Sequence, residues 1–320
     1  MKNWSDDTQG CCNTNADLAD ARQVANLLGI PFYVWNFERQ YYNQVIKHFF
    51  AEYQAGRTPN PDVMCNKEIK FKLFLERALA LGADYIATGH YARNEFKNNK
   101  YHLLRGVDPN KDQSYFLCTL GQTELAKTLF PIGEYTKPDI RKLAQKFKLP
   151  TANKKDSQGI CFIGNINVRH FLQENIKSES GNIVDTSGQI LGQHQGAVYY
   201  TLGQREGLDI KTGGGPYYVV AKNMQDNEII VSTDLDDPLL CRQTFIINNL
   251  TWTDQPVQLT QAEVAIRYRH PAYSASLEYL DQATIKITFN EPQRAITPGQ
   301  VAVIYQGSEL LGCGIIDRVL

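Results

Sequence analysis

A carboxylate and a thiol stand three residues apart in a stretch that two prolines stiffen. The stretch Arg57–Phe71 reads RTPNPDVMCNKEIKF, and it places Asp62 and Cys65 just before a helical pattern. Because Pro59 and Pro61 disfavour helix, we expect a rigid loop that presents both side chains at the mouth of a helix. The amide dipoles of a helix N-terminus favour a thiolate. Cys65 is therefore either a reactive cysteine or a buried, inert one, and the loop alone leaves both interpretations open.

A second cysteine has basic neighbours. Cys161 lies in an apolar run between Gly159 and Gly164, after two consecutive lysines at 154 and 155. Because basic neighbours lower the pKa of a thiol, Cys161 could be a reactive cysteine. The alternative interpretation is an inert cysteine in a buried strand. The seven cysteines are scattered, with no CxxC pair and no His/Cys cluster at zinc spacing. We therefore expect reduced thiols and no metal site.

Three further polar groups each have two interpretations. The run from Arg267 to His270 places an aromatic side chain between two arginines, which is typical of a single-stranded RNA contact and equally of an exposed strand end. The loop 110–116 is rich in charged and amide side chains, and taken alone this composition indicates a solvated surface turn. For His194 we favour a structural role over a catalytic one. The chain contains neither GxxxxGK[ST] nor GxGxxG.

The elements expected around these residues divide the chain in two. Helices are predicted over 14–28, 40–55, 66–81, 123–130, 137–148 and 168–176, and strands over 32–37, 85–88 and 160–163. This alternation predicts a parallel α/β sheet, whose ligands bind beyond the carboxyl ends of the strands, where Gly89 and His90 lie. After residue 180, strands at 217–221, 228–232, 262–268, 283–289 and 300–305 recur between turn signals. They predict an all-β half with one or two small barrels.

Composition excludes several classes of protein. The 320 residues carry a net charge of −1 and 42% hydrophobic residues, with no apolar run of 18 and no apolar signal-peptide core. We therefore expect a globular cytoplasmic protein with no membrane partner, whose nucleic-acid surface would need local clustering of charge. The length is too great for one ordinary core and is enough for two or three domains.

Several motifs, taken together and in order, resemble the tRNA-specific 2-thiouridylase family (MnmA/TrmU) over essentially the whole chain. They are Arg57–Phe71, Ala87–Tyr91, Lys111–Phe116, Asp156–Gly164, Thr201–Arg205 and Thr297–Gln300. The resemblance implies that residues 1–166 form an adenine nucleotide α-hydrolase-like, PP-loop ATPase type of α/β domain. It implies a small β-rich domain at 167–238 and a β-barrel at 239–320.

The resemblance also implies a reaction. ATP-dependent adenylation of the C2 oxygen of the wobble uridine, U34, would be followed by sulfur transfer from a cysteine persulfide, leaving 2-thiouridine, AMP and pyrophosphate. Adenylation turns a poor leaving group into a good one, and a persulfide is a nucleophile. Cys161 would carry the persulfide. Cys65 would attack it, releasing sulfide or closing a transient Cys65–Cys161 disulfide, with acid–base help from Asp62.

Binding residues are carried over by the same resemblance. The expected ATP contacts are Met1 and Gly89, with Mg²⁺ accompanying the ATP and no tightly bound metal cluster. The expected tRNA contacts are Asn60, Pro61, Asp62, His90, Lys111, Asp112, Gln113, Arg267, Tyr268 and Gln300. The 60–62 segment would meet a base that has left the anticodon stack. The implied partners are tRNAs of the Lys, Glu and Gln type and a sulfur-donor protein, either a cysteine desulfurase or a relay.

One departure concerns the start of the chain. The family begins with a strand, a Ser-Gly-Gly-Val-Asp-Ser loop for pyrophosphate, a helix and a second strand, whereas this sequence begins after them. Either the start lies about 30 residues too late, one βαβ unit, or the chain is truncated. Without a phosphate cradle we expect no adenylation by the chain as it stands, and exposed sheet edges with apolar surface and poor stability.

Two other classes of protein remain as alternatives. A non-catalytic tRNA-binding remnant would not need Asp62, Cys65 and Cys161. A dithiol redox protein would cycle a Cys65–Cys161 disulfide without tRNA, and it would not explain Lys111–Gln113 or Arg267–Tyr268.

Overall fold

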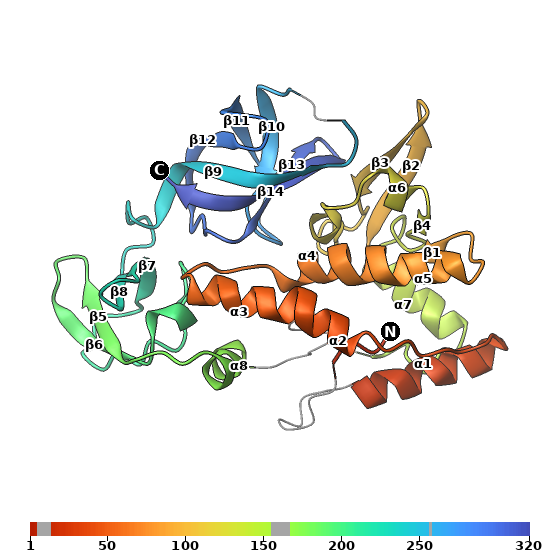
Figure 1. The fold of residues 1–320 in the computed structure, drawn as a ribbon, viewed down its shortest axis with the longest axis horizontal. Coiled ribbons are helices and arrows are strands. Elements are labelled where there is room, and N and C mark those ends of the chain that lie inside the picture. The colour runs from red at the N-terminus through yellow and green to blue at the C-terminus, as the bar shows by residue number, and fades with distance from the viewer. Residues whose placement is uncertain (5–13, 155–166, 256–257) are drawn as a thin grey trace.

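The computed structural model describes residues 1–4, 14–154, 167–255 and 258–320, and every structural statement below refers to these ranges (Figure 1). The α-helices are α1 Thr14–Leu28, α2 Glu38–Tyr41, α3 Lys47–Gln54, α4 Pro61–Cys65, α5 Leu75–Ala80, α6 Gln122–Leu125, α7 Lys137–Lys146 and α8 Val168–Asn175. π-Helical turns at Tyr42–Ile46 and Asn66–Phe74 join α2 to α3 and α4 to α5, and 3₁₀ turns lie at Ser114–Leu117 and Ala197–Tyr199. The rod formed by Pro61–Ala80 is called the 61–80 helix below.

The strands fall into three sheets. They are β1 Ile86–Ala87, β2 Ala92–Lys97, β3 Lys100–Arg105, β4 Thr128–Leu129, β5 Gly181–Asp185, β6 Ile190–His194, β7 Tyr218–Asn223, β8 Glu228–Ser232, β9 Cys241–Trp252, β10 Gln261–Ala265, β11 Tyr273–Tyr279, β12 Ile285–Arg294, β13 Val301–Gln306 and β14 Glu309–Val319. Strand β1 pairs in parallel with β4, and Lys2 forms a parallel bridge with Asn36. The predicted fold class, an α/β part with parallel strands followed by all-β parts, is confirmed.

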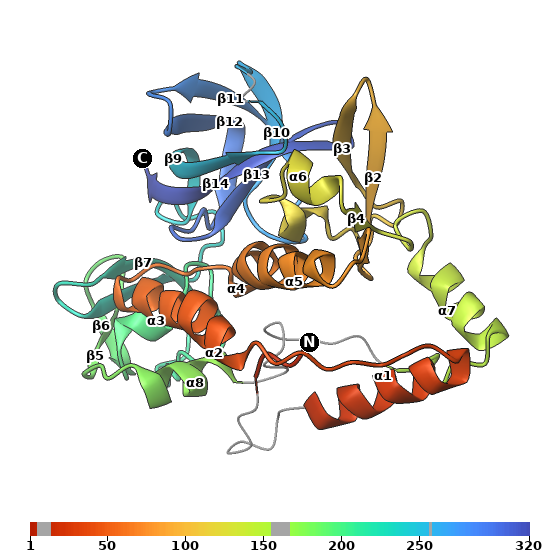
Figure 2. The same ribbon diagram turned by 45° about the vertical axis from the view of Figure 1, so that its right-hand side comes forward.

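The all-β half consists of a small sheet and a closed barrel. Strands β6-β5-β8-β7 form the central sheet. Strands β13-β10-β11-β12-β9-β14 close into the barrel because β13 also pairs with β14, which leaves no free edge among these six strands. The β2–β3 hairpin adds to β14, where Leu104 pairs with Glu309 and Leu103 with Leu310. Figures 1 and 2 show this hairpin beside the barrel, so the α/β part and the barrel share one sheet.

The helix predicted over 66–81 begins at Pro61 instead, which corrects the expectation of a loop up to Cys65. Asn60 is the N-cap and Pro61 occupies the first helical position. Proline is tolerated there because the first amides of a helix have no intrahelical partner. Asp62 and Cys65 therefore lie in the first turns of the helix and not in a loop before it.

Several other local predictions were wrong or incomplete. The strand expected over 32–37 is reduced to an isolated bridge at Asn36. The helix expected over 123–130 ends at Leu125, and Thr128–Leu129 forms strand β4. The β2–β3 hairpin was not predicted. The strand expected at 160–163 lies outside the described residues. Among those residues, no helix combines the length and apolar character needed to cross a bilayer.

The 61–80 helix lies between two hydrophobic cores. Cys65 and Ile69 belong to a core shared with the helices around α3 and with the central part of the chain. Val63, Phe71 and Leu75 belong to a second core shared with the 3₁₀ turn at 114–117 and the barrel. Each large apolar side chain that is buried contributes roughly 1.5–3 kcal/mol, so this packing more than local propensity stabilises the helix.

Helix α1 contributes little to either core. Among its described side chains Ala25 alone is buried, while Leu27 and Leu28 are more than half exposed. Ile30 and Tyr33, which follow α1, are also exposed. Several apolar side chains of this segment are therefore exposed.

Gly133 marks a close approach between two segments of the α/β part. A Cβ atom at this position would lie 1.7 Å from the carbonyl oxygen of Ala92, which is fully buried at the start of β2. We expect Gly133→Ala to lower the free energy of unfolding by about 2 kcal/mol or more, because the backbone must move. Urea unfolding measures this change.

Gly89→Ala is the matched control. Among the described residues no atom lies within 4 Å of its Cβ position, and its φ is not in the left-handed region, so we expect a change within about 0.5 kcal/mol. Equal stability of Gly133→Ala and the wild type would contradict the close approach.

Candidate active site and its supporting contacts

The segment Asn60–Asp62 stands partly exposed at the N-terminus of α4. The Asn60 side chain accepts hydrogen bonds from the backbone N–H groups of Asp62 (3.1 Å) and Val63 (3.2 Å). The Asp62 carboxylate lies in the first turn, where the helix dipole favours a negative charge. The cap therefore gives these side chains a defined position that an external group can reach.

Cys65 is fully buried, one helical turn after Asp62. Residues three apart lie on one helix face, so the carboxyl and the thiol are neighbours along the helix. Of the two interpretations left open by the sequence, burial holds for this state of the protein, and attack by Cys65 would require local opening. Cys161 lies outside the described residues, so the pairing of the two cysteines stays a prediction.

The barrel holds the backbone just before the cap. The Thr58 N–H donates to the Pro298 carbonyl (2.9 Å), and Gln300 Nε2 donates to the carbonyls of Thr58 (2.8 Å) and Pro59 (3.3 Å). Gly299 has φ +91°, and a Cβ there would lie 2.9 Å from the Thr58 nitrogen. Gln300, expected as a tRNA contact, thus uses its amide N–H groups to hold the loop.

The central part of the chain holds the same backbone from another side. Lys222 Nζ on β7 donates to the carbonyls of Gly56 (2.7 Å) and Tyr200 (2.8 Å). The hydroxyls of Thr58 and Thr201 share a hydrogen bond of 3.1 Å. Sequence reasoning missed Lys222, because a single lysine in a short strand gives no signal of a partner far away in the chain.

Arg57 begins this segment with a bidentate ion pair. Its Nε and Nη2 atoms donate to the two carboxylate oxygens of Glu52 at 2.6 and 2.5 Å. The hydrogen bond from Arg57 is the main cause that lowers the pKa of Glu52. The pair ties the segment to the end of α3.

His90 and Gln113 lie on adjoining loops. Gln113 Oε1 accepts from the Tyr91 N–H (3.1 Å), and the Gln113 N–H donates to the Tyr91 carbonyl (2.9 Å). His90 Nδ1 lies 2.8 Å from Thr88 Oγ1. Desolvation by burial, with a smaller effect of Lys70, lowers the pKa of His90 to about 3. His90 therefore carries a neutral ring at neutral pH, and Gln113 acts as a loop connector.

Asp112 organises its own loop. Its Oδ1 accepts from the backbone N–H groups of Gly106 and Ser114, both at 3.0 Å. Its Oδ2 accepts from Ser114 Oγ (2.9 Å) and pairs with Arg105 Nη1 (3.3 Å). Lys111 is partly exposed on the same loop. Asp112 therefore supports the loop that presents Lys111.

Arg267 and Tyr268 are partly exposed where the barrel meets this loop. Arg267 Nη2 donates to Thr297 Oγ1 (3.2 Å) and to the Ala295 carbonyl (3.3 Å). The Tyr268 ring lies 4.2 Å from the Phe116 ring, centroid to centroid. The structure thus brings the expected RNA contacts of the barrel together with the 111–116 loop.

Asn66 is a buried polar residue that sequence reasoning missed. Its Nδ2 donates to the Phe116 carbonyl (2.8 Å), whereas its buried Oδ1 has no hydrogen-bond partner in the described part of the chain. Asparagine is a weak helix former, so its place directly after Cys65 was an available signal. Asn66 links the helix that carries the thiol to the 111–116 loop.

The two expected ATP contacts differ in their surroundings. Met1 packs against the core that contains Cys65, and burial lowers the pKa of its amino group. Gly89 is exposed just after β1, with open space where a side chain would lie. A glycine with open surroundings allows close approach of a nucleotide to the backbone, so Gly89 fits such a ligand. Within the described ranges, no three His, Cys, Asp or Glu side chains are grouped to hold a metal ion.

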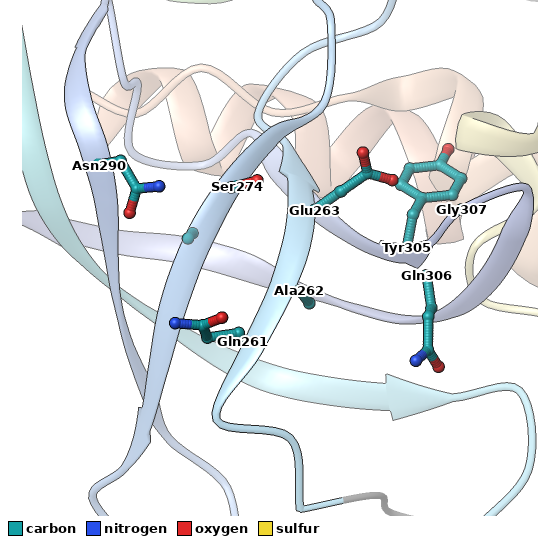
Figure 3. Close-up of a pocket in the computed structure, with 9 residues that line it drawn as sticks. Gln261, Ala262, Glu263, Ser274, Asn290, Tyr305, Gln306 and Gly307 are labelled. Carbon is teal, nitrogen blue, oxygen red and sulfur yellow. The ribbon is translucent and has the colours of Figure 1, made fainter.

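A pocket of about 290 Å³ lies elsewhere, on the outer surface of the barrel (Figure 3). Glu263 pairs with Tyr305 on the neighbouring strand. The lining residues are Gln261, Ala262, Glu263, Ser274, Ala275, Asn290, Tyr305, Gln306 and Gly307. None of them is a candidate site residue and none is basic, so this pocket does not extend the site.

Comparison with known proteins identifies the family. Family models match residues 1–165 (tRNA methyl transferase HUP domain), 169–233 (tRNA methyl transferase PRC-barrel domain) and 242–316 (aminomethyltransferase beta-barrel domain). A tRNA-specific 2-thiouridylase MnmA of Bacillus cytotoxicus is 49% identical over 100% of this chain and 87% of its own length. Proteins of the same name from Bacillus cereus and Bacillus anthracis are 48% identical with the same coverage. The chain therefore belongs to the MnmA family, the tRNA-specific 2-thiouridylases.

Proposed function

We propose that this protein is a tRNA-uridine 2-sulfurtransferase that thiolates the wobble uridine of tRNA. The observation that carries the proposal is the partly exposed Asn60–Asp62 cap on the helix of Cys65. This cap occurs in a chain that is 49% identical, over its full length, to a tRNA-specific 2-thiouridylase. A flipped base needs such an exposed and rigid polar receptor.

The proposed chemistry has two stages. The C2 oxygen of U34 attacks the α-phosphorus of ATP, and pyrophosphate leaves; Mg²⁺ would accompany the nucleotide. The outer sulfur of a Cys161 persulfide then adds at C2, and Asp62 serves as the proton acceptor or donor at the base. Cys65 attacks the inner sulfur, and the bond between the Cys161 sulfur and the sulfur on C2 breaks. AMP then departs as C2 becomes a thiocarbonyl. A Cys65–Cys161 disulfide remains, and an external thiol must reduce it.

The expected RNA contacts divide into two groups under this proposal. Lys111, Arg267 and Tyr268 would touch the tRNA directly, by charge and stacking. Asp112, Gln113 and Gln300 would act mainly by holding loops. The tRNA would be of the Lys, Glu or Gln type, the sulfur would come from a cysteine desulfurase or relay, and the reaction would be cytoplasmic.

The proposed division of labour follows the expected domains. Residues 1–166 would carry the nucleotide and the thiols. Residues 167–238 and 239–320 would hold the receiving loop and bind the tRNA body.

The first prediction concerns thiolation itself. The sequence alone leads us to expect no adenylation by this chain, whereas the proposed function requires it. Under the proposal the protein, incubated with ATP, Mg²⁺, cysteine, a cysteine desulfurase and tRNA, should form 2-thiouridine at position 34, measured by mass spectrometry of the digested tRNA. Cys65→Ser should reduce the yield by about 100-fold or more, because a hydroxyl cannot replace the attacking thiolate. Cys241→Ser, at a free cysteine on β9, is the control and should retain the yield.

ATP–pyrophosphate exchange on the same preparation tests the adenylation step separately. Tight tRNA binding with neither exchange nor thiolation would favour the non-catalytic binder and contradict the proposal.

A second prediction separates loop support from RNA contact. Asp112→Ala should lower the free energy of unfolding by roughly 2–3 kcal/mol, because several hydrogen bonds to a charged group are lost. Lys111→Ala should lower stability less than Asp112→Ala does, but weaken tRNA binding and reduce its salt dependence. Thermal unfolding and filter binding measure the two quantities; a stable Asp112→Ala protein would show that Asp112 does not hold the loop.

A third prediction concerns the protonation of two histidines, His90 and His102. His90 should stay neutral at pH 5.5, whereas His102, whose pKa the Glu309 hydrogen bond raises, should be protonated. Because the folded pKa of His90 lies near 3 and its ordinary value is 6.5, it favours the folded state above pH 6.5 and loses that contribution as the pH falls toward 3. Titration of the ring nitrogens by NMR tests this, and a His90 pKa at or above 6.5 would contradict it.

A further inference from the structure

Lys222 is a cation at the junction of the central sheet with the loop that leads to the candidate site. Its ammonium lies 2.7 Å from the Gly56 carbonyl oxygen and 2.8 Å from that of Tyr200. Among the described residues no carboxylate forms an ion pair with it. Desolvation by burial lowers the pKa of Lys222 to about 8, so it remains largely protonated at neutral pH. The ammonium charge is thus neutralised in part by hydrogen bonds to two backbone carbonyls.

The backbone at Gly56 is shaped for this contact. Gly56 has φ +75°, a region that favours glycine, and it follows the end of α3. A Cβ there would lie 2.7 Å from Met224 Cγ, two residues after Lys222. Strand β7 and Met224, the residue that follows it, therefore pack closely against the start of the 56–60 segment. This packing fixes the position of the Gly56 carbonyl that Lys222 binds.

A second contact joins the same two segments. Tyr200, whose carbonyl Lys222 binds, is followed by Thr201, whose hydroxyl lies 3.1 Å from that of Thr58. Lys222 therefore ties the 200–201 and 56–58 segments together, four residues before Asn60. In Figures 1 and 2 the segment between α3 and α4 passes beside β7.

We propose that Lys222 is a positioning residue for the reaction: from the central sheet it sets where the Asn60–Asp62 cap stands relative to the bound uridine. The proposal rests on the proposed function for its catalytic readout. Lys222 acts through the Gly56 carbonyl and touches neither tRNA nor nucleotide. Because a misplacement of about 1 Å at a reacting centre costs on the order of 100-fold in rate, a loosened cap lowers turnover more than affinity.

Lys222→Met tests the proposal, since it keeps an unbranched side chain and removes the donor. Lys211→Met is the matched control, because Lys211 is exposed in the same part of the chain and its loss removes the same charge. Amide hydrogen exchange is followed at Arg57, Thr58, Asp62 and Val63, and kcat and KM for tRNA are measured in the thiolation assay.

We expect exchange at these amides to accelerate about tenfold or more in Lys222→Met, because a charge-assisted hydrogen bond no longer closes the segment. We expect kcat to fall by about 10- to 100-fold while KM for tRNA changes by less than about twofold. Lys211→Met should match the wild type in both measurements.

Thr201→Val serves if Lys222→Met does not fold, since it is nearly isosteric and removes only the hydroxyl that contacts Thr58 and Tyr53. It should change exchange and kcat in the same direction and to a smaller extent. Unchanged exchange in these variants, or a raised KM with unchanged kcat, would overturn the proposal. If the wild type forms no 2-thiouridine the proposed function fails, and the exchange measurement alone then decides whether Lys222 positions the loop.

Discussion

The structure depends on one short stretch of backbone, residues 56–60, that is held from two directions. The barrel binds it through Pro298 and Gln300, and the central part binds it through Lys222 and Thr201. Five residues cannot bury enough apolar surface to hold themselves, and fixing each costs about 1–2 kcal/mol of backbone entropy. The order of the cap that follows is therefore supplied by parts of the chain far away in sequence.

The packing of the 61–80 helix continues the same arrangement. One face of the helix belongs to a core shared with the central part and the other face to a core shared with the barrel. Dense packing on both sides buries Val63 and Cys65, while Asn60, Pro61 and Asp62 at the start of the helix stay partly exposed. A reaction that used both Asp62 and Cys65 would thus combine the partly exposed Asn60–Asp62 cap with a buried thiol. A reactant would reach that thiol only after local opening of the structure.

Much of the local structure was predictable from the sequence. The helix over α2–α3, helix α7 with its Thr136 cap, and strands β7, β8, β10, β12 and β13 follow from apolar periodicity and turn residues. Strands β5, β6, β9, β11 and β14 were not predicted. The start of the 61–80 helix was misjudged because proline was taken as a breaker, although Asn60 and Pro61 match a cap followed by proline at the first helical position.

The contacts that hold the site were not predictable in the same way. Gln300 and Asp112 stand in motifs that pointed to RNA, yet the structure shows their polar atoms bound to backbone and loop groups. Lys222 stands in a short strand with no motif at all. The hydrogen bonds from Lys222 to Gly56 and from Gln300 to Thr58 join residues more than 150 positions apart, and no local pattern encodes which distant carbonyl a side chain will reach.

The most direct test of this account is a double-mutant cycle between Lys222→Met and Gln300→Met, read from the opening free energy of the Thr58 amide by hydrogen exchange. Both side chains bind the same five residues. Loss of the hydrogen bonds from one side chain should therefore reduce the stabilisation that the other provides. We predict that the combined loss falls short of the sum of the two single losses by about 0.5 kcal/mol or more. Strict additivity, or no effect of either substitution at Thr58, would contradict the claim that both β parts hold this segment.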